Sequence, residues 1–465
     1  MSLFRDIQTA ANIITGQDEV TVISHIDADG IAAEALMTES LSRAGIVVRS
    51  VFLRQLEPLT MHKVPEDRTL KIFCDLGAGQ QSLLAEKGLT EENVLIVDHH
   101  VSQPCERKYT QINSLVYGSN KLSAAGLAYL IAREIDSENT DLAMLGVVGN
   151  VGDMMAREEG GLTGLAHDIV EDGVLHGNIL VKRKDLNCYG TSTRPLHVCL
   201  AYNDDPFIPG ISNSVNGALR FLKKLGLNLK SREGRWLVWE ELPDDKKRVI
   251  MSALVHQLIA HGLSERRLFS ESYIFPEEPC RTPLRNAQEF ATLLNACGRW
   301  ARPLIGSAIC QGDRGVAYRE AERMLMNHRA VIRDLLQYIL ETGVTELPYF
   351  QFIHVGDRYP DTIVGIGAGM ALSKLNRRKP ILIMCTLPED PMVTKVSMRT
   401  NEQVVSMGID LQQALTKAAA HVGGAGGGHK IAAGAFIPSG REQEFMDHVN
   451  LQLAAQYAKK GTGHC

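Results

Sequence analysis

The amino-acid sequence predicts an α/β fold in which a mainly parallel sheet carries helices on both faces. Three short apolar runs, at residues 20–23, 70–74 and 94–97, have the length and composition of buried strands. Apolar residues at helical spacing follow at residues 124–132 and 142–148 and predict helices there. The alternation of strands and helices favours parallel strands joined by helical crossovers.

Three regions of the chain differ in character and give the expected domain limits. At 465 residues the chain exceeds what one hydrophobic core usually spans. Residues 1–190 repeat strand and helix units, whereas residues 191–345 contain more prolines and asparagines and longer helices. From residue 346 strand patterns return. We therefore expect an inserted, mostly helical region between the first domain and a smaller α/β domain at residues 346–465.

Composition limits the kinds of protein that this chain can be. The net charge of −5 argues against a broadly basic surface, so any nucleic-acid contact must be local. No apolar run approaches the roughly 20 residues of a membrane span, and the first residues lack a signal-peptide pattern. The nine cysteines form no Cys-x-x-Cys pair, which favours reduced thiols. We expect a cytoplasmic protein with no membrane partner.

The first candidate site lies where the first apolar run gives way to a helix. His25, Asp27 and Asp29 fall within five residues, and Gly30 allows a tight bend after them. An aspartate that caps the helix would explain one of the acids but not all three ligand-type residues. The segment is therefore a candidate metal site.

Acids and imidazoles also follow the other apolar segments. Asp75 follows the second run, Asp98, His99 and His100 end the third, and Asp153 follows the helix at 142–148. The carboxyl ends of parallel strands meet at one edge of a sheet, so these side chains are expected around one cavity. Oxygen and imidazole ligands without thiolates suit Mn²⁺ or Mg²⁺ better than structural zinc. Two cations would balance the clustered carboxylates better than one.

The C-terminal region has a second group of candidates. The glycine run at residues 423–428 leads directly into His429, and a strand-like segment ends near Arg399. Such a run is often only a flexible connector. Since glycines lack side chains, their amides can also approach an anion closely and bind it. We expect phosphate or nucleotide binding at Gly426, Gly427, Gly428 and His429.

The motifs and their order resemble those of the DHH phosphoesterase superfamily. The matching residues are His25-x-Asp27-x-Asp29-Gly30, Asp75, Asp98-His99-His100 and Gly149-x-x-Gly152-Asp153. Residues 421–434 are similar to the glycine-rich signature of that superfamily's C-terminal partner domain. Residues 294–299, with the sequence LNACGR, and the long middle region resemble archaeal RecJ-like exonucleases that act on single strands.

The resemblance implies a two-metal site and assigns roles to its residues. His25, Asp27 and Asp75 would hold one cation, and Asp75 would bridge to a second cation held by Asp29, His99 and Asp153. Mn²⁺ is the first expectation for both cations and Mg²⁺ the alternative. A water activated between them would attack the phosphate without a covalent enzyme intermediate. His100 would contact the scissile phosphate, Asp98 would orient its neighbour, and Arg399 would contact a substrate phosphate.

The function implied is an exonuclease on single-stranded DNA or RNA that releases nucleoside monophosphates during DNA replication or repair. Two alternatives stay open. One is a phosphodiesterase for oligoribonucleotides or cyclic dinucleotides. The other is a replication scaffold, without catalysis, that associates with the GINS complex. The long middle region favours the exonuclease, and the complete set of acids and histidines argues against a pure scaffold.

Overall fold

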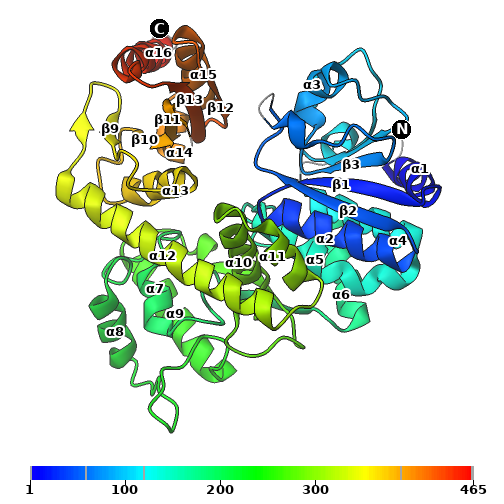
Figure 1. Cartoon of the computed structure of the whole chain (residues 1–465). Coiled ribbons are helices and arrows are strands. Elements are labelled where there is room, and N and C mark those ends of the chain that lie inside the picture. The colour runs from blue at the N-terminus through cyan, green and yellow to red at the C-terminus, as the bar shows by residue number, and fades with distance from the viewer. Residues whose placement is uncertain (1–2, 58–59, 119–120, 388–389, 462–465) are drawn as a thin grey trace. The chain divides into compact units, whose positions relative to one another are not determined.

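The computed structural model describes residues 3–57, 60–118, 121–387 and 390–461 (Figure 1). It divides into two compact units, Met1–Met324 and Leu325–Cys465, and the boundary falls within helix α12 (Val316–Thr342).

The elements of the first unit alternate as predicted. Its strands are β1 (Glu19–His25), β2 (Val47–Leu53), β3 (Leu70–Cys74), β4 (Val94–Asp98), β5 (Thr110–Asn113), β6 (Leu180–Leu186) and β7 (Phe269–Ile274). Its helices are α1 (Leu3–Thr15), α2 (Ala28–Arg43), α3 (Gln81–Glu86), α4 (Ala124–Ile135), α5 (Ala143–Gly152), α6 (Leu165–His176), α7 (Leu196–Ala201), α8 (Val215–Lys224), α9 (Asp244–Ala260), α10 (Ala287–Arg299) and α11 (Pro303–Cys310).

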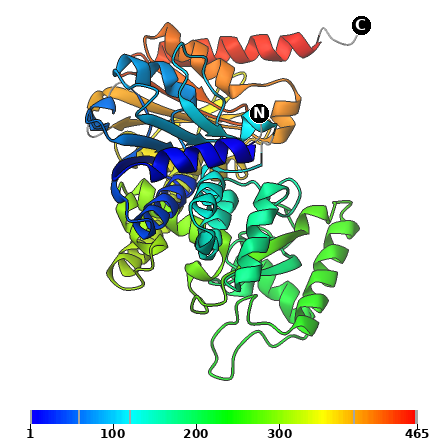
Figure 2. The same cartoon turned by 90° about the vertical axis from the view of Figure 1, so that its right-hand side faces the viewer.

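The first five strands form one parallel sheet in the order β2-β1-β3-β4-β5. All five residues of β3 and of β4 are buried, as expected for apolar strands covered on both faces. Helices α2 and α4 pack on the sheet, α5 packs against both, and α1 lies against α4 and β5 (Figure 2). The parallel sheet with helices is therefore confirmed.

The other face of this sheet is covered with less regular structure than expected. An apolar cluster there includes Ile23, Phe73 and Ile96 from the strands, with Leu84 from the short helix α3. Connecting segments add Met61 and Tyr109.

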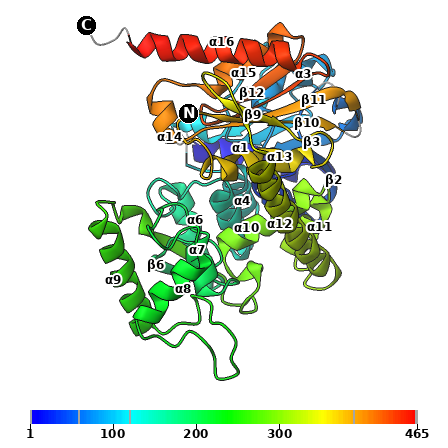
Figure 3. The ribbon, with the colours of Figure 1, turned by 90° about the vertical axis from the view of Figure 1, so that its left-hand side faces the viewer.

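The middle region has a hydrophobic core of its own. Helices α7, α8 and α9 gather there (Figure 3), and Trp239, 2% exposed, lies in the apolar cluster that includes Leu222 and Leu254 from α8 and α9. Strands β6 and β7 form an antiparallel pair in which Leu186 faces Phe269. Helices α10 and α11 then return to pack against α2. The mostly helical character is confirmed, while the expected limits at 190 and 345 stay predictions.

The second unit is a mixed sheet with helices on both faces. Its strands are β8 (Thr345–Glu346), β9 (Gln351–His354), β10 (Ile381–Leu387), β11 (Asp390–Arg399), β12 (Ala425–Gly428) and β13 (Ala432–Pro438), in the order β12-β13-β11-β10-β9-β8. Its helices beyond α12 are α13 (Asp361–Leu372), α14 (Glu402–Ser406), α15 (Leu411–His421) and α16 (Glu442–Gly461). Residues of α12 and α13 cover one face, and α15 and α16 contribute to the core on the other.

Among the described residues, none of the helices combines the length and apolar character needed to cross a bilayer.

Candidate metal centre

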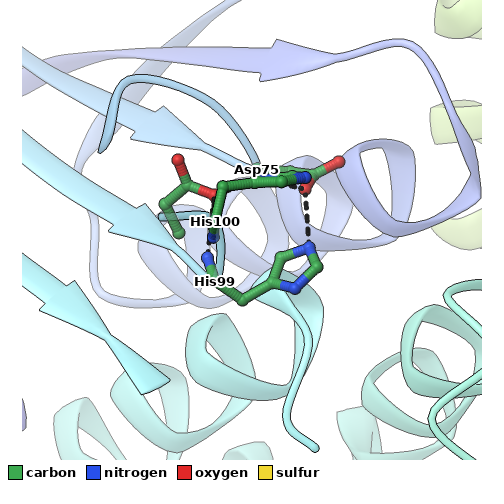
Figure 4. Close-up of side chains that lie close together, drawn as sticks. Asp75, His99 and His100 are labelled. Carbon is green, nitrogen blue, oxygen red and sulfur yellow. Dashed lines mark hydrogen bonds and ion pairs between the residues drawn. The ribbon is translucent and has the colours of Figure 1, made fainter. Parts of the chain in front are cut away.

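Several of the candidate ligands lie at the carboxyl ends of three neighbouring strands of the parallel sheet. β1 ends at His25, β3 ends one residue before Asp75, and β4 ends one residue before His99. Because β3 lies between β1 and β4, Asp75 is placed between the two histidines. Figure 4 shows Asp75 beside His99 and His100.

The first group of ligand atoms lies around His25. Its Nδ1 is 3.1 Å from Oδ2 of Asp27 and 3.1 Å from Oδ2 of Asp75. The other oxygen of Asp27 accepts a hydrogen bond of 3.0 Å from the N–H of Gly30 and so caps α2. Asp27 is therefore both a helix cap and a candidate ligand, and the two interpretations do not exclude each other.

The second group of ligand atoms lies around His99. Its Nε2 is 3.0 Å from Oδ2 of Asp153, 3.2 Å from Oδ1 of Asp75 and 3.8 Å from Oδ2 of Asp29. Asp153 follows the last residue of α5 and caps its C-terminus. The two oxygens of Asp75 thus face different groups, Oδ2 toward His25 and Oδ1 toward His99.

The backbone at Asp75 has an unusual conformation. Its φ of 60° lies in the left-handed region, which aspartate and asparagine adopt more readily than most residues. The Asp75 N–H donates to the carbonyl of Val97 on the neighbouring strand at 3.0 Å, and the side chain is 2% exposed. The turn after β3 therefore holds this carboxylate in a buried and fixed position.

Asp29 is held by backbone groups that the sequence did not indicate. Its two oxygens accept hydrogen bonds of 2.8 and 2.9 Å from the N–H groups of Ala124 and Ala125 at the start of α4. A helix N-terminus carries partial positive charge, which stabilises a carboxylate. A Cβ at Gly149 would lie 2.6 Å from Oδ1 of Asp29. The glycine in the fourth motif therefore leaves room for this carboxylate.

Asp98 positions the histidines that follow it. It is 1% exposed, and its Oδ1 accepts from the His99 N–H at 2.8 Å and from Nδ1 of His100 at 2.8 Å. Its Oδ2 accepts from the N–H of Ala78 at 3.0 Å. The side chain of His100 is 50% exposed, so its Nε2 is the ring nitrogen that a substrate can reach. These contacts are compatible with the predicted orienting role of Asp98, which stays a prediction.

The electrostatics of the site show a shortage of positive charge. Burial and the charges of Asp75 and Asp153 raise the pKa of Asp29 well above its usual range. Burial also raises the pKa of Asp153 to about 6. Burial opposes protonation of His99, but the neighbouring carboxylates nevertheless raise its pKa to about 10. The site without metal thus holds protons among its carboxylates.

Two buried atoms in the centre make ion-pair contacts but no well-aligned hydrogen bond within the described part of the chain. They are Oδ1 of Asp75 and Nε2 of His99. Buried polar atoms normally have partners, and a coordinated cation would supply one for each. Carboxylate oxygens with imidazole nitrogens form a suitable donor set for Mn²⁺ or Mg²⁺. The residues present therefore fit divalent cations.

Sequence reasoning missed the contribution of α10 to this centre. Oδ1 of Asn295 accepts a hydrogen bond of 3.0 Å from the N–H of Ala28. Burial lowers the pKa of Arg299, and the charge of Asp27 partly offsets this effect. Both residues belong to the LNACGR segment, which sequence reasoning used only as a mark of resemblance.

Arg399 and His429 lie in the second unit. Nη1 of Arg399 donates to the carbonyls of Met398 and Ala433, at 2.9 and 3.2 Å, and burial lowers the pKa of this arginine. His429 is exposed, and its backbone N–H donates to the carbonyl of Ala432 at 2.8 Å. Since Ala432 pairs with Arg399, the strand register places the turn at His429–Ala432 beside the arginine.

The glycine run is not the open loop that sequence reasoning considered, because β12 is an edge strand paired with β13. A Cβ at Gly426 would lie 2.7 Å from the carbonyl oxygen of Leu415, and one at Gly428 would lie 2.6 Å from that of Ala432. Close packing accounts for these two glycines. Gly427 has open space where a side chain would be, so it is the glycine best placed to let a ligand approach the backbone.

Three domain models match the chain, in an order that agrees with the motifs. The N-terminal domain of the DHH family matches residues 19–148, the DHH-CID domain matches residues 188–270, and the DHHA1 domain matches residues 349–455.

Similar proteins span nearly all of the chain. An uncharacterized protein of Methanocaldococcus jannaschii is 25% identical over 450 residues, which is 94% of each chain. RecJ from Thermus thermophilus in complex with Mn²⁺ has a TM-score of 0.59 and 16% identity, over 97% of this chain and 55% of that one. CDC45 from Entamoeba histolytica has a TM-score of 0.64 and 11% identity, over 97% and 98% of the two chains.

The present chain thus spans about half the length of the Thermus RecJ chain. At sequence identities of 16% and 11%, the similarity to the solved structures shows only a shared fold. The domain models carry the assignment to a family, since all three occur together in one chain. The protein therefore belongs to the DHH superfamily and has a RecJ-like fold.

Proposed function

We propose that this protein is a two-metal phosphodiesterase that digests single-stranded DNA or RNA from an end and releases nucleoside monophosphates, in DNA replication or repair. The observation that carries the proposal is the carboxylate of Asp75, whose two oxygens face two separate groups of ligand atoms. A carboxylate between two such groups is suited to bridge two cations.

Each group would hold one cation, with Mn²⁺ proposed first and Mg²⁺ as the alternative. His25 and Asp27 would bind the first cation with Asp75. Asp29, His99 and Asp153 would bind the second, again with Asp75. When bound, such cations supply Lewis acidity and lower the pKa of water enough for it to act as a nucleophile near neutral pH.

The protein's own side chains would bind and orient the substrate. Asp98 accepts from Nδ1 of His100 and raises the pKa of this ring, so the protonated ring would also donate through Nε2 to an oxygen of the scissile phosphate. Arg299, which is half-buried and feels the charge of Asp27, would neutralise a second phosphate charge. These contacts would hold the phosphate for attack by water, and no covalent bond to the enzyme would form.

The second unit would bind the end of the nucleic-acid strand. Arg399 and His429 can contact phosphate, and the open face of Gly427 lets a ligand approach the backbone of β12. The middle region has an apolar core of its own, and a binding site for a small substrate would not need such an additional folded region. This favours a long strand over an oligoribonucleotide or a cyclic dinucleotide.

The alternative of a replication scaffold draws support from the similarity to CDC45, and association with the GINS complex belongs to that alternative. Against a scaffold without catalysis stands the complete set of carboxylates and imidazoles at the strand ends. A protein that only binds partners has no need of several buried carboxylates packed around a histidine.

Cleavage of labelled single strands of 5 and 40 nucleotides, with Mn²⁺, with Mg²⁺ and with EDTA, separates these proposals. An exonuclease shortens both strands to mononucleotides when metal is present. A phosphodiesterase for small substrates cleaves only the shorter strand, and a scaffold cleaves neither. Absence of cleavage of the 40-nucleotide strand with either metal would overturn the proposed exonuclease.

A further inference from the structure

Helix α10 contacts the loop between β1 and α2 and the first turn of α2, which together carry two of the candidate ligands. Oδ1 of Asn295 accepts a hydrogen bond of 3.0 Å from the N–H of Ala28. Ala28 stands between Asp27 and Asp29, whose carboxylates belong to different ligand groups. The N–H groups in the first turn of a helix have no partner within that helix. Asn295 therefore accepts the hydrogen bond of an N–H group that lies between the backbone positions of Asp27 and Asp29.

A second contact, one turn further along α10, holds the same loop. A Cβ at Gly298 would lie 1.7 Å from the carbonyl oxygen of Ile26, so the backbone of the helix lies directly against the loop. Residues 295 and 298 are three apart and share one face of the helix. The hydrogen bond and the close packing together fix the loop from one side.

The other end of α10 is tied to the start of the middle region. Glu289 is 0% exposed, and it accepts hydrogen bonds from the N–H of Ser192, at 2.8 Å, and from the hydroxyl of Thr193. Asn286 caps the helix by accepting from the N–H of Gln288 at 2.9 Å. Because both ends of α10 make specific polar contacts, the helix has little freedom to slide or rotate.

We propose that Asn295 is a positioning residue for the metal centre. By holding the N–H of Ala28, it sets the relative positions of the Asp27 and Asp29 carboxylates. Without this acceptor, the N–H competes for the carboxylate of Asp27, which then turns away from His25. Glu289, at the other end of α10, connects this support to the middle region. The inference rests on the metal centre of the proposed function, but not on its substrate.

A matched pair of variants tests the role of the acceptor. Asn295→Asp keeps an acceptor at the same position, whereas Asn295→Leu has a similar size and no acceptor. Isothermal titration of the metal-free full chain with Mn²⁺, without substrate, measures binding directly. We expect Asn295→Leu to weaken Mn²⁺ binding by about tenfold or more, as is usual when a partner of a metal ligand is lost. Asn295→Asp should bind within about threefold of wild type, or more tightly, because it retains the hydrogen bond.

Thermal melts in EDTA separate positioning from general folding. Equal melting temperatures for the two variants, together with different Mn²⁺ affinities, support a positioning role. Equal Mn²⁺ affinities for the two variants overturn it. If Asn295→Leu does not fold, Asn295→Ala replaces it, since alanine adds no volume and also lacks the acceptor.

The same titrations distinguish this inference from the proposed function. If wild type binds Mn²⁺ but cleaves no nucleic acid, the proposed substrate is wrong and the comparison of the variants still decides the role of Asn295. If wild type binds no Mn²⁺, the proposed metal centre fails and the positioning role fails with it.

Discussion

Oδ1 of Asp75 lies 3.2 Å from Nε2 of His99, and in the described part of the chain neither buried atom makes a well-aligned hydrogen bond. The other oxygen of Asp75 lies 3.1 Å from Nδ1 of His25. One carboxylate therefore joins the two halves of the candidate site, so changes at Asp75 test the site most directly.

Asp75→Asn should lower phosphodiester hydrolysis by a factor on the order of 10² or more, since it removes the bridging charge while keeping the size of the side chain. Asparagine tolerates the left-handed backbone at this position, whereas alanine would be strained. Cleavage rates at saturating Mn²⁺ measure the effect. In EDTA the variant should melt no lower than wild type, because one of several crowded carboxylates is gone. Asp18→Asn, an exposed acid in the same unit, is the matched control. Near-normal cleavage by Asp75→Asn would contradict the two-metal site.

Binding of Mn²⁺ near pH 7.5 should release protons. The pKa of His99 in the metal-free protein is raised to about 10, above the roughly 6.5 of a free imidazole, so the ring is protonated between these values. Protonated His99 contributes fully to the stability of the metal-free fold below about pH 6.5. This contribution is lost as the pH rises through the pKa of His99 in the folded protein. A metal ligand must be neutral, so the cation displaces the proton. Titrations in two buffers of different ionisation enthalpy measure the release, and identical observed enthalpies would refute it.

His100→Gln should reduce hydrolysis without changing Mn²⁺ affinity. Nδ1 of His100 is bound to Asp98, and the exposed Nε2 is proposed to donate to the substrate phosphate. Loss of such a donor lowers rates on the order of 10²-fold. Rates at saturating Mn²⁺, compared with Mn²⁺ binding by titration, separate the two effects. Weaker Mn²⁺ binding by this variant would mean that His100 is a metal ligand.

Arg399→Ala and His429→Ala should weaken binding of nucleic acid more than they slow cleavage of a minimal substrate. Each loses a charge-assisted contact to phosphate, which contributes on the order of 1.5–3 kcal/mol. Rates on a 40-nucleotide strand and on bis(p-nitrophenyl) phosphate give the comparison. Arg378→Ala removes an exposed arginine of the same unit and serves as the control. Equal losses on both substrates would place these residues in the catalytic centre itself.

Gly149→Ala should disturb Asp29 and so weaken binding of Mn²⁺. The added methyl group would lie 2.3 Å from Cβ of Ala125 and 2.6 Å from Oδ1 of Asp29. Overpacking of this kind costs about 1–3 kcal/mol of stability. Gly369→Ala, where the added group meets nothing within 4 Å, is the control, and within α13 it should be neutral or slightly stabilising. Melting temperatures and Mn²⁺ titrations of the two variants show whether Gly149 is needed for space.

The parallel sheet and the gathering of acids at its edge could be predicted because each signal is local. An apolar run that ends in Asp or His identifies both the strand and the position of the side chain, as at Asp75 and His99. Their roles as ligands stay predictions.

Other parts of the site had no such local signal. Ala124 and Ala125 hold Asp29 through backbone N–H groups, which no side-chain pattern reveals. Asn295 is 267 residues from Ala28, so their contact depends on the packing of the whole unit. The run of glycines at β12 has low strand propensity, and pairing with β13 overrides that preference.

The pairing of Leu186 with Phe269 has a consequence for protein engineering. Opposite residues in an antiparallel pair lie about 5 Å apart, so a two-residue turn can replace everything between them. Residues 187–268 therefore begin and end at neighbouring positions of the β6–β7 pair. Trp239 of this segment donates to Asp185, and Glu240 and Glu241 accept from Arg285 and Arg281. A module grafted at this junction must therefore replace these contacts as well as those of Ser192 and Thr193 with Glu289.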